Sequence, residues 1–207
     1  MEMNNATPLE RGVGTLASPL EIALERIRNC VDGEVDLSHL GLTELPPLPE
    51  GLKHVTCLFN QLTSLPTLPS SLRSLYCGYN RLTSLPSLPS LDYLHCQHNQ
   101  LKNLPVLPPS LLTLICYTNQ LASLPELPPT LEILRCGTNP LRTLPTLPST
   151  LEVLACELPI EIDEVEEIQH GGSMKYSGMY PALVEAVNQM VRKAAVFQAK
   201  RADSQKQ

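Results

Sequence analysis

The stretch LRSLYCGYNRLTSLPSLP, residues 72–89, contains a pattern that recurs with small changes along the middle of the chain. The consensus of the recurring unit is L-x-x-[LV]-x-C-x-x-N-x-L-x-x-L-P-x-L-P. Its cysteine returns in steps of 20, 19, 20, 20 and 20 residues. The recurring residues are Cys57, Cys77, Cys96, Cys116, Cys136 and Cys156, with Asn60, Asn80, Asn99, Asn119 and Asn139 three residues after the first five. A fixed period of this kind indicates a solenoid, in which each unit packs on the next.

Each unit is predicted to contain one short strand and one extended return segment. Leu75, Tyr76 and Cys77 alternate inward, outward and inward, as residues of a strand do. The Asn side chain can bond the backbone of the following turn, so stacked units would form a ladder of amides. Proline removes donors and disfavours helix in the residue before it, so the Leu-Pro-x-Leu-Pro segment is predicted to run extended, polyproline-like, along the convex side. A divergent first unit begins at Val35. The pattern predicts about seven parallel strands over residues 35–158, in a stack roughly 30 Å long.

These units resemble the LPX-type leucine-rich repeats of bacterial effectors that leave the cell by type III secretion. The resemblance covers residues 35–158 and implies a leucine-rich-repeat solenoid with parallel β-strands on its concave face. Similar repeats occur in effectors made of repeats alone and in effectors that add a C-terminal E3 ubiquitin ligase domain. Here only about fifty residues follow the repeats. The ligase domain is therefore not expected in this chain.

Seven cysteines raise the possibilities of a disulfide ladder and of a metal site. Six of them hold the same inward strand position, where Cys acts as a small apolar residue. The remaining one, Cys30, precedes the first repeat and is expected to pack in the cap. Zinc sites need closely spaced ligands such as C-x-x-C, and no such pair of cysteines occurs. We expect buried, reduced thiols and no metal or cofactor, which suits a reducing compartment.

The side chains that flank the inward strand residues are predicted to form the concave, solvent-facing side. The repeat does not fix these positions, yet Tyr, Phe and His gather there, and from His54 onward these columns contain no acidic residue until Glu157. Such side chains on one surface are typical of a binding site. A second interpretation is that the rings only stack along the ladder. His95 and His98 also raise the possibility of a metal site or of a pH-sensitive contact, although their side chains do not obviously converge. The candidate partner-binding residues are His54, Thr56, Phe59, Tyr76, Tyr79, Tyr93, His95, His98, Ile115, Tyr117 and Arg135.

The two ends of the chain depart from the repeat. Residues 1–17 are rich in Asn, Thr, Ser and Gly and are expected to be disordered. Residues 18–34 form a predicted N-terminal cap with a helix over about 19–30, because Ser18, Pro19 and Glu21 make a capping box with Pro in the first turn. The predicted apolar stripe of this helix contains Leu20, Ala23, Leu24 and Ile27.

After the repeats, residues 159–180 are acidic and are expected to be either a closing cap or a linker. Residues 181–202 are predicted to form an amphipathic helix, which would dock on the solenoid, mediate self-association or, less well supported, bind a membrane surface. Its apolar stripe consists of Leu183, Val187, Met190, Val191, Ala194 and Phe197.

Charge and composition narrow the function further. The net charge of −6 argues against general affinity for nucleic acid. No apolar run is long enough to cross a membrane, and the start lacks a signal-peptide pattern. The chain has no phosphate-binding glycine loop and no nucleophile elbow. We expect no catalytic residues and localisation in a cytoplasm, either the producer's or, after secretion, a host's.

The sequence therefore favours a non-enzymatic module that binds a host partner protein through the concave face, as an effector would. Two alternatives remain open. The chain could be the substrate-recognition fragment of a truncated relative of the ubiquitin ligases, or a structural protein that assembles end to end.

Overall fold

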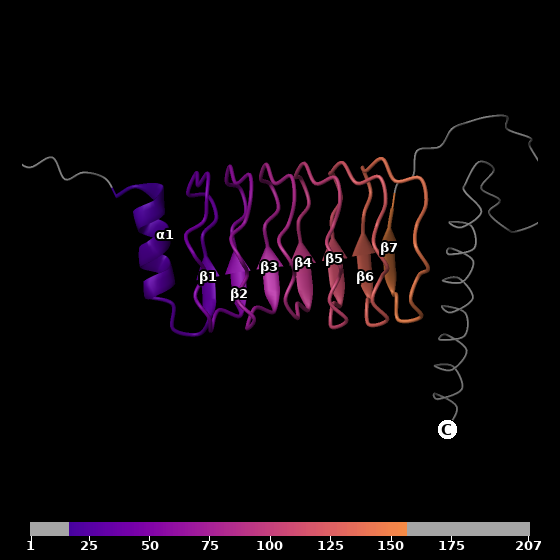
Figure 1. Ribbon diagram of the computed structural model, residues 1–207, viewed down its shortest axis with the longest axis horizontal. Helices are drawn as coiled ribbons and strands as arrows, with labels where there is room; N and C mark the ends of the chain where they lie inside the picture. Colours follow the sequence, from indigo (N-terminus) through magenta and orange to yellow (C-terminus); the bar gives the residue numbers. More distant parts are fainter. Residues whose placement is uncertain (1–16, 157–207) are drawn as a thin grey trace, which may run out of the picture.

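The computed structural model describes residues 17–156, which form one helix followed by seven short strands (Figure 1). Each strand is three residues long and is followed by a return segment without regular secondary structure. The elements are α1 (Pro19–Arg28), β1 (Glu34–Asp36), β2 (His54–Thr56), β3 (Ser74–Tyr76), β4 (Tyr93–His95), β5 (Thr113–Ile115), β6 (Ile133–Arg135) and β7 (Val153–Ala155).

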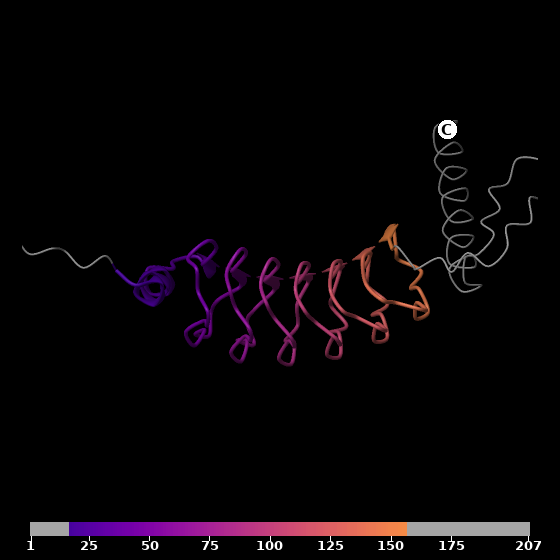
Figure 2. The ribbon, with the colours of Figure 1, turned by 90° about the horizontal axis from the view of Figure 1, so that it is seen from above.

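The strands form one parallel sheet in chain order, β1 to β7, so each unit pairs only with its sequence neighbours. Figure 2 shows the strands along the inner side of a shallow arc, with the return segments on the outer side. The leucine-rich-repeat solenoid predicted from the sequence is confirmed, including the non-helical Leu-Pro segments.

The step from Cys77 to Cys96 is 19 residues, one shorter than the others, yet it keeps the register of the sheet. Leu75 of β3 pairs with Leu94 of β4, just as Leu94 pairs with Leu114 of β5. The missing residue is absorbed in the turn before β4, where the Leu91 amide donates to the carbonyl of Pro89, two residues back, at 2.7 Å. In the neighbouring unit the Leu72 amide reaches Pro69, three residues back, at 3.1 Å. A shorter turn therefore leaves every inward side chain in place.

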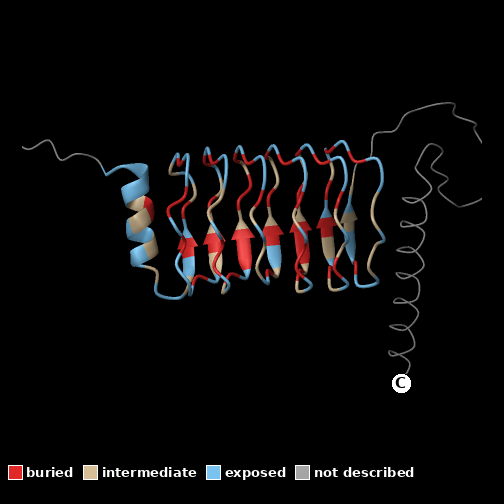
Figure 3. Ribbon diagram, in the orientation of Figure 1, coloured by how far each residue is buried: buried red, intermediate tan, exposed pale blue. Residues whose placement is uncertain are grey.

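Cysteine and leucine fill the interior of the coil, and Figure 3 shows this buried material running from strand to strand. Cys57, Cys77, Cys96, Cys116 and Cys136 are 0% exposed, and all seven cysteines of the chain are free thiols. The prediction of buried, unpaired thiols is confirmed for these five. Burial raises the pKa of Cys77 to about 12, because a thiolate loses its hydration there. These thiols therefore act as small apolar side chains.

The asparagines form the predicted ladder, and each joins two units. The Asn99 side-chain oxygen accepts from the Leu82 amide at 2.9 Å, and its nitrogen donates to the carbonyls of Cys77 and Cys96 at 3.0 and 3.1 Å. The same three bonds recur at Asn60, Asn80, Asn119 and Asn139. All five asparagines are buried, so they satisfy backbone groups that water cannot reach.

The helix α1 covers the first repeat. The Ser18 hydroxyl accepts from the Glu21 amide at 3.2 Å, and the Glu21 carboxylate accepts from the Ser18 amide at 2.7 Å, which confirms the capping box. The helix ends at Arg28 rather than near residue 30, because Asn29 already leaves helical geometry. Ala23 is fully buried and Ile27 packs on the core, but Leu20 is 37% exposed, so the predicted apolar stripe is only partly used.

Several sequence predictions lie outside the described residues. They concern the disordered start over residues 1–17, apart from its last residue, the acidic cap or linker over 159–180, and the helix over 181–202. Between residues 17 and 156, no helix is long and apolar enough to span a bilayer.

Candidate interaction face

The outward side of the sheet and of the turn after each strand forms one surface, which we call the strand face. The sheet register places Thr56, Tyr76, His95, Ile115 and Arg135 in a single row across β2 to β6. The first outward strand position contributes a second row, and the two turn positions after the inward Cys contribute a third and a fourth. The structure brings all eleven candidate residues to this face, and none of them is buried: His54, Thr56, Phe59, Tyr76, Tyr79, Tyr93, His95, His98, Ile115, Tyr117 and Arg135.

Four rings stack in a continuous column along the turns. His39, Phe59, Tyr79 and His98 lie nearly parallel, with centroid distances of 4.6, 4.3 and 4.3 Å between successive rings. Tyr117 meets His98 edge-on at 5.2 Å. The sequence analysis missed His39, although it stands four residues after Val35 as Phe59 stands four after Val55. The stacking that was one of the two interpretations of these rings is therefore present.

The ring column is held at an unusual backbone conformation. His39, Phe59, Tyr79 and His98 all have positive φ, between 51° and 58°, and so do Thr118 and Thr138 further along. A residue with a Cβ pays roughly 1–2 kcal/mol to occupy this left-handed region. Glycine would avoid that strain, yet none of the six positions carries it. Strain that persists in unit after unit points to a use for the side chains.

A second aromatic contact lies on the strands themselves. The rings of Tyr76 and His95 meet edge-on, with centroids 4.6 Å apart. Burial lowers the pKa of His95, and the positive charge of Arg135 lowers it further. The imidazole is therefore neutral at pH 7 and acts as a flat polar contact group.

Arg135 has no hydrogen-bond or ion-pair partner on the part of the chain that is described, residues 17–156, and its side chain is exposed. Its positive charge acts to lower the pKa of both Tyr117 and His95, so Arg135 lies near these two side chains. Burial raises the pKa of Tyr117, and so does the hydrogen bond between the side chains of Tyr117 and Tyr79. Among residues 17–156, one end of the strand face therefore presents a cation without an ion-pair partner beside hydroxyl and imidazole groups.

The opposite end of the strand face is acidic. Glu34 and Asp36 flank Val35 on β1 and stand in the same rows as His54 and Thr56. The Glu34 carboxylate lies 3.9 Å from the His54 imidazole, which also bonds the Ser74 hydroxyl at 2.9 Å. Sequence analysis started these rows at His54 and therefore missed the two acids. The apolar spacing of the Val35 unit is enough to place Glu34 and Asp36 in these rows, even though this unit lacks the Cys and the Asn of the repeat.

Gln97 is a further residue of this face that the candidate residues did not include. Its side chain lies over Gly78, so a Cβ added at Gly78 would come within 2.8 Å of the Gln97 amide. The Gln97 side-chain oxygen is buried and has no hydrogen-bond partner among residues 17–156. Gly78 is therefore small for a packing reason.

Within residues 17–156, no group of three or more His, Cys, Asp and Glu side chains is placed to hold a metal ion. The two candidate histidines take part in different contacts, His95 with Tyr76 and His98 with Tyr79. The chemistry that this face supports is recognition by rings, hydroxyls and a few charges.

Comparison with known proteins gives consistent results. A family model for leucine-rich repeats (2 copies) matches residues 70–109. The YopM structure from Yersinia enterocolitica WA-314 is 38% identical, with a TM-score of 0.65 over 75% of this chain and 37% of that one. A Shigella effector LRR domain is 39% identical, with a TM-score of 0.63 over 70% of each chain. YopM from Yersinia pestis is 36% identical, with a TM-score of 0.60 over 70% of this chain and 50% of that one. This chain therefore spans little more than a third of the length of the Yersinia enterocolitica protein. Among curated proteins no match was found.

Proposed function

The chain belongs to the bacterial leucine-rich-repeat proteins of the effector type, and from that premise we propose that it binds a partner protein through the strand face. Leucine-rich-repeat solenoids typically serve as non-catalytic interaction scaffolds, and their curvature creates an extended concave surface. The proposal extends this to a specific surface of this chain, formed by the eleven candidate residues together with Glu34, Asp36, His39 and Gln97.

The observation that carries the proposal is the ring column at positive φ. The interior of the coil is complete without these rings, because leucine, cysteine and asparagine fill it. Phe59 of the column is 45% exposed, and Tyr93 on the neighbouring strand surface is 39% exposed, so rings of the strand face keep apolar area in contact with water. Exposed aromatic side chains on a rigid scaffold gain most when a partner covers them, and Tyr and Arg are frequent hot-spot residues.

The charges on the strand face suggest how a partner is oriented. Glu34 and Asp36 lie on β1, whereas Arg135 lies on β6, five strands away. At about 4.8 Å between strands the two ends are roughly 24 Å apart, which an extended segment of about seven residues spans. We expect the partner to place a basic side chain near β1 and an acidic side chain near Arg135.

The relatives and the free thiols support a proposal about the place of action. The similar Shigella structure is that of an effector domain, and the Yersinia pestis protein is described as a leucine-rich effector. We propose that this chain likewise acts as an effector in a host cytoplasm. Its free cysteines are compatible with that reducing compartment.

Partner capture with matched variants tests the proposal. The full chain is immobilised, exposed to host-cell lysate, and the retained proteins are identified and then purified for a direct binding assay. We expect Tyr76→Ala combined with His95→Ala to abolish binding, and Lys102→Ala combined with Val106→Ala to leave it unchanged. Lys102 and Val106 are exposed residues of the return segments. Binding that survives the first pair and is lost with the second would place the interaction on the convex side.

The ligase alternative depends on Cys156. Its side chain forms a hydrogen bond with that of Cys136, which together with burial raises the pKa of Cys136. Cys156 thus continues the inward thiol column, so we propose that it has no catalytic role. A ubiquitin-discharge assay compares the full chain with Cys156→Ala. A thioester that forms on the parent and disappears in the variant would establish the ligase relationship instead.

A further inference from the structure

The last repeat differs from the others in how well its apolar side chains are covered. Leu94, Leu114 and Leu134 are 0% exposed, but Leu154 in the same row is only half-buried. The same change occurs from Cys136 to Cys156. We call the partly buried apolar side chains at this end of the stack the end face, which consists of Leu144, Leu147, Leu154 and Cys156. The contrast with the inner repeats rests on Leu154 and Cys156, because Leu65, Leu88 and Leu127 of the inner return segments are partly buried like Leu144 and Leu147.

The backbone is also incomplete at this end. Among the described strands, β7 has a neighbour on one side only, β6. An open strand edge beside an apolar surface is a site where proteins place a helix or a loop, or where another chain pairs. The end face thus has both the apolar area and the exposed edge of an unfinished core.

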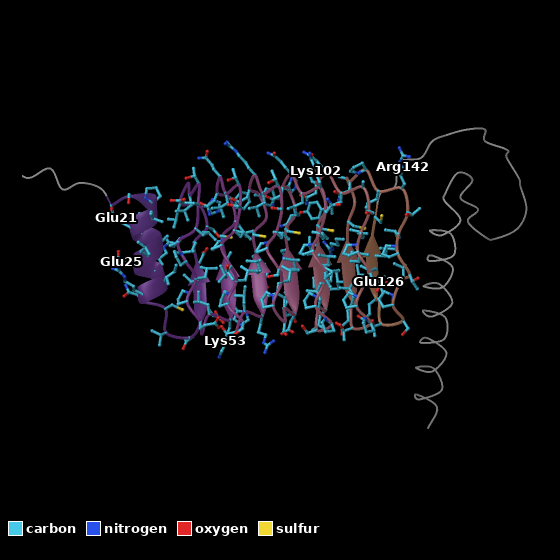
Figure 4. All side chains as sticks on the ribbon, in the orientation of Figure 1. Glu21, Glu25, Lys53, Lys102, Glu126 and Arg142 are labelled. Carbon is cyan, nitrogen blue, oxygen red and sulfur yellow. The ribbon has the colours of Figure 1, made fainter. Side chains whose placement is uncertain are left out.

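The other end of the stack shows what a completed end looks like. Val35, Leu37 and Leu42 of the first unit are less than a tenth exposed, and Ala23 of α1 is fully buried among the apolar residues there. Figure 4 shows Glu21 and Glu25 on the outer side of α1, away from the repeats. This charged outer surface does not complement an apolar end face. Stacking of a second copy head to tail is therefore disfavoured.

The sequence after Cys156 offers a matching occupant. Residues 181–202 carry an apolar stripe at helical spacing, formed by Leu183, Val187, Met190, Val191, Ala194 and Phe197. They follow Cys156 after a stretch of 24 residues, 157–180, which keeps the stripe at high effective concentration near the end face. We propose that residues 181–202 dock through this stripe on the end face and close the solenoid. This inference does not rest on partner binding by the strand face.

The reactivity of Cys156 reports on the proposed contact. In a full chain that carries Cys30→Ser, Cys156 is the only thiol outside the fully buried column. The test variant is Val187→Glu with Met190→Glu, which places two charges in the stripe. The matched control is Asn188→Glu with Gln189→Glu, which adds the same charge on the opposite side of the predicted helix.

We expect maleimide to react slowly with Cys156 in the parent and in the control, and at least about tenfold faster in the test variant. The five interior thiols must stay protected in all three proteins, which shows that the solenoid itself is folded. Equal rates in all three proteins would overturn the proposal. So would protection that disappears on dilution together with a dimer mass, because the occupant would then be a second copy.

A reciprocal measurement covers the case in which the charged stripe disturbs its own helix. Leu147→Glu changes the end face and leaves residues 181–202 intact. Hydrogen exchange of amides 183–197 is expected to accelerate in this variant. Unchanged exchange there would contradict docking on the end face.

Discussion

The interior of the coil and the strand face are built from the same repeats but follow different rules. Inside, each of the five units that contain Cys57, Cys77, Cys96, Cys116 and Cys136 supplies leucines, one cysteine and one asparagine at the same positions, and the asparagines make the same contacts. Outside, the row that contains Tyr76 holds a different residue in every unit. Packing demands uniformity because each unit must fit the next, whereas a surface that meets one partner is free to vary. Residues that break the uniformity are therefore the ones to test for binding.

The largest expected difference between the two regions concerns asparagine. Asn99→Ala removes four hydrogen bonds and leaves the Leu82 amide without a partner, whereas the carbonyls of Cys77 and Cys96 keep their bonds from Asn80 and Asn119. Because an unpaired buried amide costs about 1–3 kcal/mol and each lost bond to a carbonyl contributes about 0.5–1.5 kcal/mol, we expect a loss of about 4 kcal/mol in the free energy of unfolding. Urea unfolding measures it, with Asn103→Ala as the exposed control. A loss similar to that of the control would show that the amide ladder is not a source of stability.

A second prediction compares the same residue in the middle and at the end of the interior. Leu94 is fully buried, so Leu94→Ala should cost about 3 kcal/mol through lost burial and the cavity that remains. Residues 17–156 leave Leu154 half-buried, so the docking proposed for residues 181–202 should bring the cost of Leu154→Ala close to that of Leu94→Ala. Urea unfolding of both variants checks the difference. A much smaller cost for Leu154→Ala would mean that residues beyond 156 do not bury Leu154 as a neighbouring repeat would.

The strand face should respond in the opposite way. Tyr76→Ala with His95→Ala removes one edge-on ring contact, which is worth about 1 kcal/mol. We expect a similarly small loss in the free energy of unfolding, together with the loss of partner binding. A stability loss as large as that of Leu94→Ala would show that these rings belong to the core and would remove the main argument for a docking face.

The smallest effect concerns the strained turns. Thr118 has a φ of 54° and no ring to stack, so Thr118→Gly should raise the free energy of unfolding relative to Thr118→Ala by about 1 kcal/mol. Thermal unfolding of the two variants provides the comparison. In Phe59→Gly, with a φ of 54°, the same gain should be offset by the loss of two ring contacts. A Thr118→Gly variant that is no more stable than Thr118→Ala would indicate that these turns carry no strain.

Sequence reasoning predicted the uniform part of the molecule well, since a residue such as Cys77 can be assigned from its period alone. The Asn ladder and the capping box at Ser18 followed from side-chain chemistry that acts over a few residues. The ring stacking from His39 to His98 and the bond between Tyr79 and Tyr117 could not be predicted with certainty, because they depend on the twist between units and on the φ of each turn. Glu34 and Asp36 were missed because the first unit lacks the Cys and the Asn that mark the register.

The assignment of thiols to the interior and rings to the strand face is tested most directly by counting reactive cysteines in the native chain. In a variant with Cys30→Ser and Cys156→Ser, only the five buried thiols remain. We predict that a bulky maleimide leaves all five unmodified under native conditions and modifies all five after unfolding in denaturant. Rapid modification of these thiols in the folded chain would contradict the inward assignment, and with it the strand face.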